Sequence, residues 1–243
     1  MSGDLSGTTT LVVGASRGLG RGIAAALAEA GAPVVAVART APELAGVAAS
    51  EAADATDPAA ARRLLDRHDP LAVVLVAGAS PALGPLQDQT WETFSVNWHA
   101  DVRIAFAWLG EILRRPLRPG SRVVVISSGA ALAGSPLSGG YAGAKATQRF
   151  LAGYAQDEAN RAGLGITVTA VLPRLTPLTD LGRPAVRAYA ARGGLSEEDY
   201  LRQLGDPLTP EAAGAAVVDL VRADAASIAP AYLLSAAGLK ALT

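Results

Sequence analysis

The sequence of 243 residues contains no cysteine, which excludes disulfide bonds, thiolate catalysis and cysteine-ligated metal sites. Its two histidines, His68 and His99, are too few for a histidine-rich metal site, so we expect no metal cofactor. Basic and acidic residues are nearly balanced, 21 against 22, and no basic block occurs. The charge pattern of a nucleic-acid-binding protein is therefore missing, and we predict no nucleic-acid partner.

Long apolar runs are also missing. No stretch approaches the ~20 apolar residues needed to cross a bilayer. The first ten residues lack the basic region and the apolar stretch of a secretory signal. We therefore expect a cytoplasmic protein with no membrane partner. Half of the residues are nevertheless apolar, which is enough for a substantial core, and the length suits one large α/β domain.

Short apolar runs alternate with longer alanine-rich segments along the chain. The apolar runs lack strict alternation of apolar and polar residues, which is typical of strands covered on both faces. We expect strands at residues 10–13, 34–38, 72–77, 122–127, 166–172 and 231–234, and helices at residues 18–30, 58–66, 91–114, 141–162 and 210–222. This order predicts an α/β fold in which residues 1–243 form a single domain, with a doubly wound parallel sheet and helices on both faces.

One segment, residues 173–205, is irregular. It holds three of the fifteen prolines, several glycines and a polar stretch at residues 196–200. It follows the end of an expected strand, where open α/β sheets bind ligands, so we interpret it as a substrate lid. The alternative is a packed helical insertion with no gating role.

A glycine-rich loop follows the first expected strand and leads into an alanine-rich helix. It reads Val13-Gly14-Ala15-Ser16-Arg17-Gly18-Leu19-Gly20. Glycines let the backbone turn tightly and approach a pyrophosphate, and a helix N-terminus offers free N–H groups with positive partial charge. Tight turns use glycine for other reasons too, but the place of this loop between strand and helix predicts dinucleotide binding by a Rossmann-type domain.

The residues after the second expected strand bear on which dinucleotide binds. An NAD enzyme of this fold places Asp or Glu there to hold the ribose hydroxyls, whereas this sequence has Ala38-Arg39-Thr40. A guanidinium clamps a 2′-phosphate that a carboxylate repels, and Arg17 would face the same phosphate. We therefore predict NADP(H) as the cofactor. The alternative is that both arginines are solvated surface residues.

The strongest local signal is Tyr141-Ala142-Gly143-Ala144-Lys145. Residues i and i+4 share a helix face, so this spacing puts a phenol beside an ammonium group. A tyrosine has a pKa of about 10, and a nearby cation favours the phenolate. We therefore expect Tyr141 to exchange a proton with a carbonyl or alcohol oxygen near neutral pH. The chain has only two lysines, yet one of them stands here.

The Gly-x-x-x-Gly-x-Gly spacing and the Tyr-x-x-x-Lys pair resemble the short-chain dehydrogenase/reductase family, and the resemblance covers nearly the whole chain. Asp54-Ala55 is similar to the family's Asp-Val pair, whose Asp receives the adenine amino group, and residues 39–54 leave room for about one helical turn. The resemblance implies that the cofactor is bound by Gly14, Ser16, Arg17, Gly18, Leu19, Gly20, Arg39, Thr40, Asp54, Ala55, Ala77, Gly78, Tyr141, Lys145, Pro173 and Thr176.

Two further catalytic residues follow from this resemblance. Ser128 stands thirteen residues before Tyr141, the spacing of the family's serine that hydrogen-bonds the substrate oxygen, and Ser127 is the competing candidate. Asn97 resembles the family's helix asparagine, whose backbone holds a water that links the lysine to solvent. A polar residue on a helix face is the alternative for Asn97.

Four positions depart from the family pattern. Val13 replaces a threonine, and Leu75-Val76 replaces two asparagines, so bracing of the central sheet there is expected to be apolar. Arg174 replaces a glycine that lies close to the nicotinamide, and its side chain either points into solvent or adds a positive group beside the site.

The sequence therefore predicts an NADP(H)-dependent oxidoreductase that interconverts a carbonyl and an alcohol on a small molecule. We expect a ketone or aldehyde reductase in which Ser128, Tyr141, Lys145 and Asn97 are catalytic. The alternatives are an NAD-linked alcohol dehydrogenase and a dinucleotide-sensing regulator without turnover. The resemblance also implies a homodimer or homotetramer, paired through the helices at residues 91–114 and 141–162.

Overall fold

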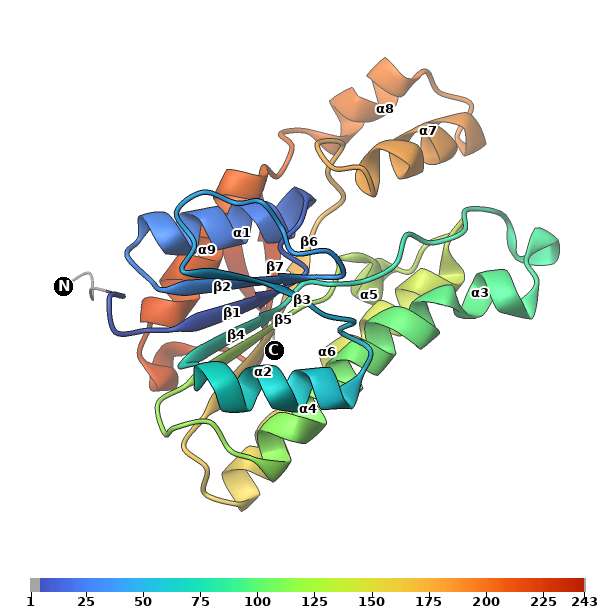
Figure 1. The fold of residues 1–243 in the computed structure, drawn as a ribbon. Helices are drawn as coiled ribbons and strands as arrows, with labels where there is room; N and C mark the ends of the chain where they lie inside the picture. The colour runs from blue at the N-terminus through green and yellow to red at the C-terminus, as the bar shows by residue number, and fades with distance from the viewer. Residues whose placement is uncertain (1–4, 243) are drawn as a thin grey trace.

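Eight strands form one sheet in residues 5–242, which the computed structural model describes. The strand order is β3-β2-β1-β4-β5-β6-β7-β8, and every neighbouring pair is parallel except β7 and β8 (Figure 1). The strands are β1 (Thr10–Val13), β2 (Val34–Ala38), β3 (Ala49–Ala52), β4 (Ala72–Leu75), β5 (Arg122–Ile126), β6 (Thr167–Pro173), β7 (Ala231–Ser235) and β8 (Gly238–Leu242). The order reverses direction between β1 and β4, which is where doubly wound sheets bind ligands.

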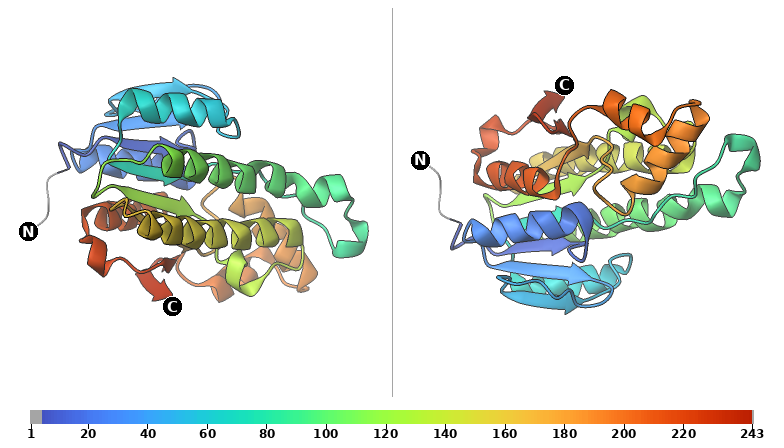
Figure 2. Two further views of the ribbon diagram at one scale, coloured as in Figure 1. Left: turned by 90° about the horizontal axis from the view of Figure 1, so that it is seen from below. Right: turned by 90° about the horizontal axis from the view of Figure 1, so that it is seen from above.

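Helices cover both faces of this sheet. On one face, α1 (Gly18–Glu29) packs beside α9 (Pro210–Arg222); on the other, α4 (Arg103–Arg114) packs between α2 (Pro58–His68) and α6 (Gly139–Arg161) (Figures 1 and 2). The remaining helical elements are η1 (Leu86–Asp88), α3 (Trp91–Asn97), the π-helical turn η2 (Trp98–Val102), α5 (Ala130–Ala133), α7 (Gly182–Arg192), α8 (Glu197–Leu204) and η3 (Ala225–Ser227). In the described part of the chain, no helix has the length and apolar character needed to span a bilayer.

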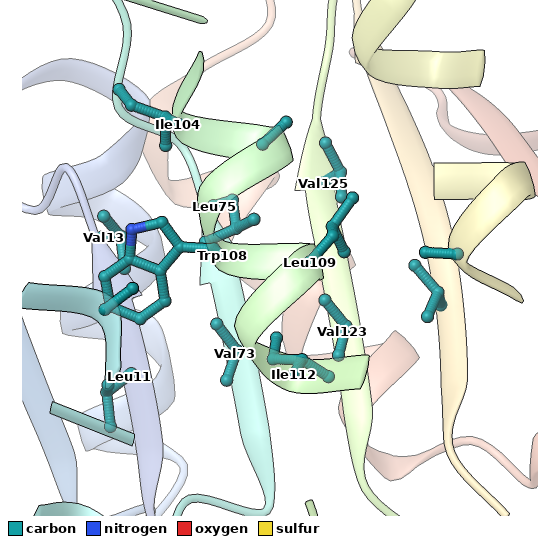
Figure 3. Close-up of a cluster of buried hydrophobic side chains, with 14 of the residues drawn as sticks. Leu11, Val13, Val73, Leu75, Ile104, Trp108, Leu109, Ile112, Val123 and Val125 are labelled. Atoms are coloured by element: carbon teal, nitrogen blue, oxygen red, sulfur yellow. The ribbon is translucent and has the colours of Figure 1, made fainter. Parts of the chain in front are cut away.

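The central strands are apolar because both of their faces are buried. Alternate residues of β1, β4 and β5 point toward α4, where Trp108 and Leu109 pack against them (Figure 3). Leu75, at one of the positions where the family has asparagine, is 1% exposed within this layer, so the bracing there is apolar, as expected. The indole Nε1 of Trp108 donates to the carbonyl of Ala55 at 3.1 Å and so fixes the turn that follows β3.

All the predicted strands and helices occur, with their ends shifted by a few residues. Residues 76–77 and Ser127 lie beyond the strands to which they were assigned, and the predicted helix at 91–114 is interrupted by the π-turn η2. Residues 39–48 contain no helix, so the single helical turn expected before Asp54 is absent, and the strand β3 occupies part of residues 39–54 instead. Neither edge strand, β3 or β8, is indicated by the apolar pattern.

Residues 173–205, the segment interpreted as a lid, contain the helix pair α7 and α8. Figure 1 shows this pair standing off the sheet, on the side of α1. The rings of Tyr189 on α7 and Tyr200 on α8 stack with their centres 6.4 Å apart, which holds the two helices together. The segment therefore has a folded core of its own beside the carboxyl ends of the strands.

Candidate active site

A cleft of about 1360 Å³ lies at the carboxyl ends of the parallel strands. Its walls come from the segments that follow β1 to β6 and from the helix pair α7 and α8. Among the predicted site residues, those that line it are Gly14, Ser16, Arg17, Gly18, Leu19, Gly20, Arg39, Asp54, Ala55, Ala77, Gly78, Ser128, Tyr141, Lys145, Pro173 and Thr176. Thr40 and Asn97 are not among the lining residues. The volume exceeds the usual range for one drug-sized ligand, so the cleft has room for a cofactor and a substrate together.

The glycine loop lies tightly against the end of β4. Gly14 has a φ of +103°, and a Cβ there would lie 2.5 Å from the amide nitrogen of Ala77. A Cβ on Gly20 would lie 2.0 Å from the carbonyl oxygen of Gly14. Any larger residue at either position would push the loop away from the sheet. The glycines thereby place the N-terminus of α1 at the cleft wall.

This helix end suits an anionic group. The side chain of Arg17, at the N-cap of α1, makes no capping hydrogen bond, and the first turn of α1 contains no acidic residue. The first amides of a helix have no partner within the helix, and they carry positive partial charge. A pyrophosphate therefore fits this end of the cleft.

Two arginines border the same region. Arg17 and Arg39 line the cleft, and both are exposed. Neither guanidinium has a hydrogen bond or a short ion pair within residues 5–242. No acidic residue occupies the end of β2, where the sequence is Ala38-Arg39. Both guanidinium groups are therefore available to a phosphate.

Asp54 is held in a tight turn after β3. Its Oδ1 accepts from the backbone N–H of Thr56 at 2.9 Å and from the Thr56 hydroxyl at 2.8 Å. These two hydrogen bonds lower the pKa of Asp54 and outweigh burial, which raises it; the charges of Arg103 and Arg39 add smaller downward effects. The carboxylate stays ionised and faces the cleft as an acceptor, as an adenine amino group requires.

Tyr141 and Ser128 present free hydroxyl groups to the cleft. Within the described residues, the Tyr141 hydroxyl forms no hydrogen bond. The Oγ of Ser128 accepts from the amide of Ala130 at 3.2 Å, which leaves its proton available. The buried Ser127 hydroxyl instead donates to the carbonyl of Lys145 at 2.7 Å. This difference supports Ser128 over Ser127 as the serine that contacts substrate.

Lys145 is buried, and its ammonium group lies 5.6 Å from the centre of the Tyr141 ring. Three acceptors surround it: Oδ1 of Asp101 at 2.9 Å, Oε1 of Gln148 at 2.8 Å and the carbonyl of Ile126 at 3.3 Å. Burial lowers the pKa of Lys145, but the Asp101 carboxylate and the Tyr141 hydroxyl outweigh burial, and the net shift is upward. Lys145 is therefore a protonated ammonium in the folded protein.

Asn97 lies behind the cleft wall and is 1% exposed. Its side-chain Nδ2 donates to the carbonyl of Ala79 at 2.8 Å and to Oδ2 of Asp101 at 3.0 Å. Asn97 is thus linked to Lys145 through Asp101. Neither Asp101 nor Gln148 is indicated by the motifs in the sequence, although an acid four residues after Asn97 on one helix face was an available signal.

The segment after β6 contributes the remaining wall. The hydroxyl of Thr176 donates to the carbonyl of Leu208 at 2.6 Å and is buried, so it is committed to the fold. Thr179, which no motif indicates, lines the cleft, and its methyl group lies 3.5 Å from the position of a Cβ on Gly18. Arg174 is exposed, yet it also lines the cleft.

Comparison with known proteins adds to this geometry. Residues 8–190 match the family model described as short chain dehydrogenase. A short chain dehydrogenase of Pseudocercospora fijiensis is 30% identical over 59% of this chain, and the chain covers about half (52%) of that relative's length. A versicolorin reductase of Emericella nidulans is 30% identical over 85% of this chain and 83% of its own. The crystal structure of a short chain dehydrogenase from Burkholderia cenocepacia, in complex with NADP, superposes with a TM-score of 0.77 at 26% identity, covering 94% of this chain and 96% of that one.

Proposed function

The chain belongs to the short chain dehydrogenase family of oxidoreductases, and on this premise we propose that it is an NADP(H)-dependent reductase that converts the carbonyl group of a small molecule to an alcohol. The observation that carries the proposal is the Tyr141 hydroxyl. It lies in the cleft without an internal hydrogen bond, one helical turn from the protonated Lys145, and Ser128, whose proton is available, lines the same cleft.

These side chains divide the work of carbonyl reduction. A bound NADPH supplies the hydride that is added to the carbonyl carbon. Ser128 donates a hydrogen bond to the carbonyl oxygen and orients it, and Tyr141 gives the oxygen its proton. Lys145 places a positive charge beside the phenol as the proton leaves. In the reverse direction, Tyr141 accepts the proton from the alcohol.

The residues present fit NADP(H). The bare glycine loop and the N-terminus of α1 would hold the pyrophosphate, and the carboxylate of Asp54 would accept from the adenine amino group. Arg17 and Arg39, which make no hydrogen bond or short ion pair within residues 5–242, would bind the 2′-phosphate. The presence of NADP in the related Burkholderia structure supports the same choice.

The substrate end of the cleft is apolar with a few polar groups. Leu132, Leu175 and Leu181 line it together with the rings of Tyr189 and Tyr200. Such a wall suits a substrate with an aromatic or apolar body, and the similarity to a versicolorin reductase is consistent with an aromatic ketone. Residues 173–205 are proposed to act as the lid over this end.

A screen of ketones and aldehydes with NADPH, followed by the matching alcohols with NADP⁺, tests the proposal. With the best substrate, Tyr141→Phe should lower kcat/KM by about 10²–10⁴-fold, because the ring still packs but the transferable proton is gone. Binding of NADPH, followed by its fluorescence, should be retained. A Tyr141→Phe variant with near-wild-type turnover would refute the role of Tyr141.

A further inference from the structure

The carboxylate of Asp101 contacts three groups in a buried cluster behind the active site. Asp101 is 1% exposed and stands in the π-turn η2. Its Oδ2 accepts from the backbone N–H of Ala79 at 2.9 Å and from Nδ2 of Asn97 at 3.0 Å. Its Oδ1 lies 2.9 Å from the Lys145 ammonium and, within residues 5–242, has no other partner. A buried carboxylate without compensation is costly, so the charge is balanced by Lys145.

The loop after β4 packs so closely against the Asp101 carboxylate that no side chain fits at residue 78. A Cβ on Gly78 would lie 2.5 Å from Oδ1 of Asp101, so the loop after β4 can approach only because residue 78 is glycine. Gln148 joins the cluster from α6: its Oε1 accepts from Lys145 at 2.8 Å and its Nε2 donates to the carbonyl of Asp101 at 2.9 Å. The carboxylate thus connects α6 to the segment at residues 78–79 on the cleft wall.

Asp101 is the acidic side chain that faces Lys145. The other charged groups on the elements packed against α6 are exposed or already paired. The exposed ones are Glu92, His99 and Arg103. Glu111 pairs with Arg62 and Arg114, and Arg122 donates to the carbonyls of Gly120 and Ala223. The remaining charged residues of α6 lie farther along the helix: Arg149, Asp157, Glu158 and Arg161. On the opposite wall of the cleft, the charged residues are exposed: Arg174, Asp180, Arg192 and Asp206. The hydroxyl of Tyr189, on the same wall, is hydrogen-bonded to Ser135. The groups that raise the pKa of Lys145 are Asp101 and, when it is ionised, Tyr141.

We propose that Asp101 is a positioning residue of the active site, whose carboxylate fixes the Lys145 ammonium and cancels part of its charge beside Tyr141, so that Tyr141 keeps its proton for carbonyl reduction. This inference rests on the proposed function of Tyr141 as the proton donor. A bare ammonium in a buried site promotes ionisation of a neighbouring phenol, whereas an ammonium paired with a carboxylate does so less. Asp101 thereby extends to higher pH the range in which Tyr141 holds the proton that carbonyl reduction needs.

The substitution Asp101→Asn removes this charge and keeps the shape. Oxidation of the alcohol product needs ionised Tyr141, so kcat/KM for oxidation increases with pH. In the variant this increase should occur about one pH unit lower than in wild type. Carbonyl reduction needs protonated Tyr141, so the decrease of its kcat/KM with rising pH should shift to lower pH by the same amount, while the equilibrium constant still governs the ratio of the two directions. The measurement is the pH profile of both directions in wild type and variant.

A matched control separates this effect from general damage to the fold. Glu111 on α4 is also a buried carboxylate, 2% exposed, and it is paired with Arg62 and Arg114 away from the cleft. The substitution Glu111→Gln should lower the melting temperature and leave the pH profiles in place. If the profile of Asp101→Asn coincides with that of wild type or moves to higher pH, the proposed role of Asp101 is wrong.

A second measurement uses the wild-type protein and does not depend on how well the variant folds. Lys145 and Lys240 are the two lysines of the chain, and Lys240 is exposed. In protein labelled with ¹³C-lysine, the two side chains give separate signals, which Lys240→Arg assigns. Because Asp101 stabilises the ammonium, Lys145 should lose its proton at higher pH than Lys240. Loss of the proton from Lys145 at lower pH would overturn the ion pair.

The two proposals fail in different ways. If Tyr141→Phe is inactive but Asp101→Asn keeps the wild-type profile, the reductase function stands and the role of Asp101 falls. If Tyr141→Phe keeps wild-type activity, the function of Tyr141 falls, and the inference built on it falls as well, even where the lysine titration shows the ion pair.

Discussion

The hydroxyl group of Tyr189, on α7, is hydrogen-bonded to the hydroxyl group of Ser135, which lies between α5 and α6. Ser138, just before α6, lies 3.3 Å from the same Tyr189 hydroxyl and 2.7 Å from the Ser135 hydroxyl. The helix pair α7 and α8 is thus fastened to the loop that joins the segment of Ser128 to the helix of Tyr141. If residues 173–205 act as the proposed lid, this contact docks them beside Ser128 and Tyr141.

Tyr189→Phe should loosen this contact. The variant keeps the stacked ring on Tyr200 but loses the hydroxyl, and a neutral hydrogen bond contributes roughly 0.5–1.5 kcal/mol. We expect KM for the carbonyl substrate to rise about two- to tenfold, with a smaller change in kcat, and amide hydrogen exchange to quicken in residues 182–204. Tyr154→Phe, on the outer face of α6, is the control. Unchanged exchange in Tyr189→Phe would show that the hydroxyl contact does not hold the lid.

Lys145→Arg should inactivate the enzyme even though the charge is kept. Three acceptors converge on one ammonium nitrogen, from Asp101, Gln148 and Ile126, and a planar guanidinium on a longer stem cannot occupy that point. We expect kcat/KM to fall by at least about a hundredfold and the melting temperature to drop, because the site is buried. Lys240→Arg, at the other lysine, should behave as wild type. Activity of Lys145→Arg within a fewfold of wild type would contradict the role proposed for Lys145.

The sequence predicts the part of the fold that positions the site, because central parallel strands are read directly as apolar runs. The edge strand β3 has the sequence Ala49-Ser50-Glu51-Ala52 with alternate residues exposed, and so short a polar stretch is not distinguished from a loop. The antiparallel strand β8, Gly238–Leu242, is missed because it has only five residues and none of them is fully buried.

The same division holds for the site. Tyr141, Lys145 and the glycine loop are predicted from spacing, because their chemistry is local to one helix or one turn, whereas Ser128 is predicted from the resemblance to the family. Asp101 does not, since its meaning depends on a tertiary contact with Lys145, a residue of another helix. An acidic residue in a helix is normally exposed to solvent. The burial of Asp101 becomes evident only once the tertiary structure places Lys145 beside it. Thr179 is hidden likewise, because a fold in residues 173–205 brings it to the glycine loop.

Association into a homo-oligomer is predicted through α4 and α6, which lie side by side (Figure 2). Their outer faces expose Phe106 (63%), Phe150 (67%) and Tyr154 (54%), a group of aromatic residues that is unusual on a free surface. We expect wild type to be a dimer or tetramer at micromolar concentration by light scattering, and Phe150→Glu to dissociate it by placing a charge in the interface. Leu86→Glu, an exposed apolar position outside these helices, is the control. A wild-type monomer under these conditions would refute the prediction.

Arg39→Asp should invert the cofactor preference. Arg39 stands at the end of β2 on the cleft wall, and its guanidinium has no hydrogen bond or short ion pair within the described residues, so a 2′-phosphate would be its partner. The substitution replaces a charge-assisted hydrogen bond with repulsion, so NADPH binding should weaken by about tenfold or more. NADH should gain, because the new carboxylate accepts from the ribose hydroxyls. Arg17 remains, so discrimination between the two cofactors should not vanish.

The measurement is kcat/KM for both cofactors, with Arg63→Asp on the exposed face of α2 as the charge-matched control. Two outcomes would contradict the assignment of NADP(H): a wild type that already prefers NADH, or an Arg39→Asp variant whose NADPH-to-NADH ratio of kcat/KM equals that of wild type and of Arg63→Asp. In either case Arg39 is a surface residue, and the assignment loses its main support.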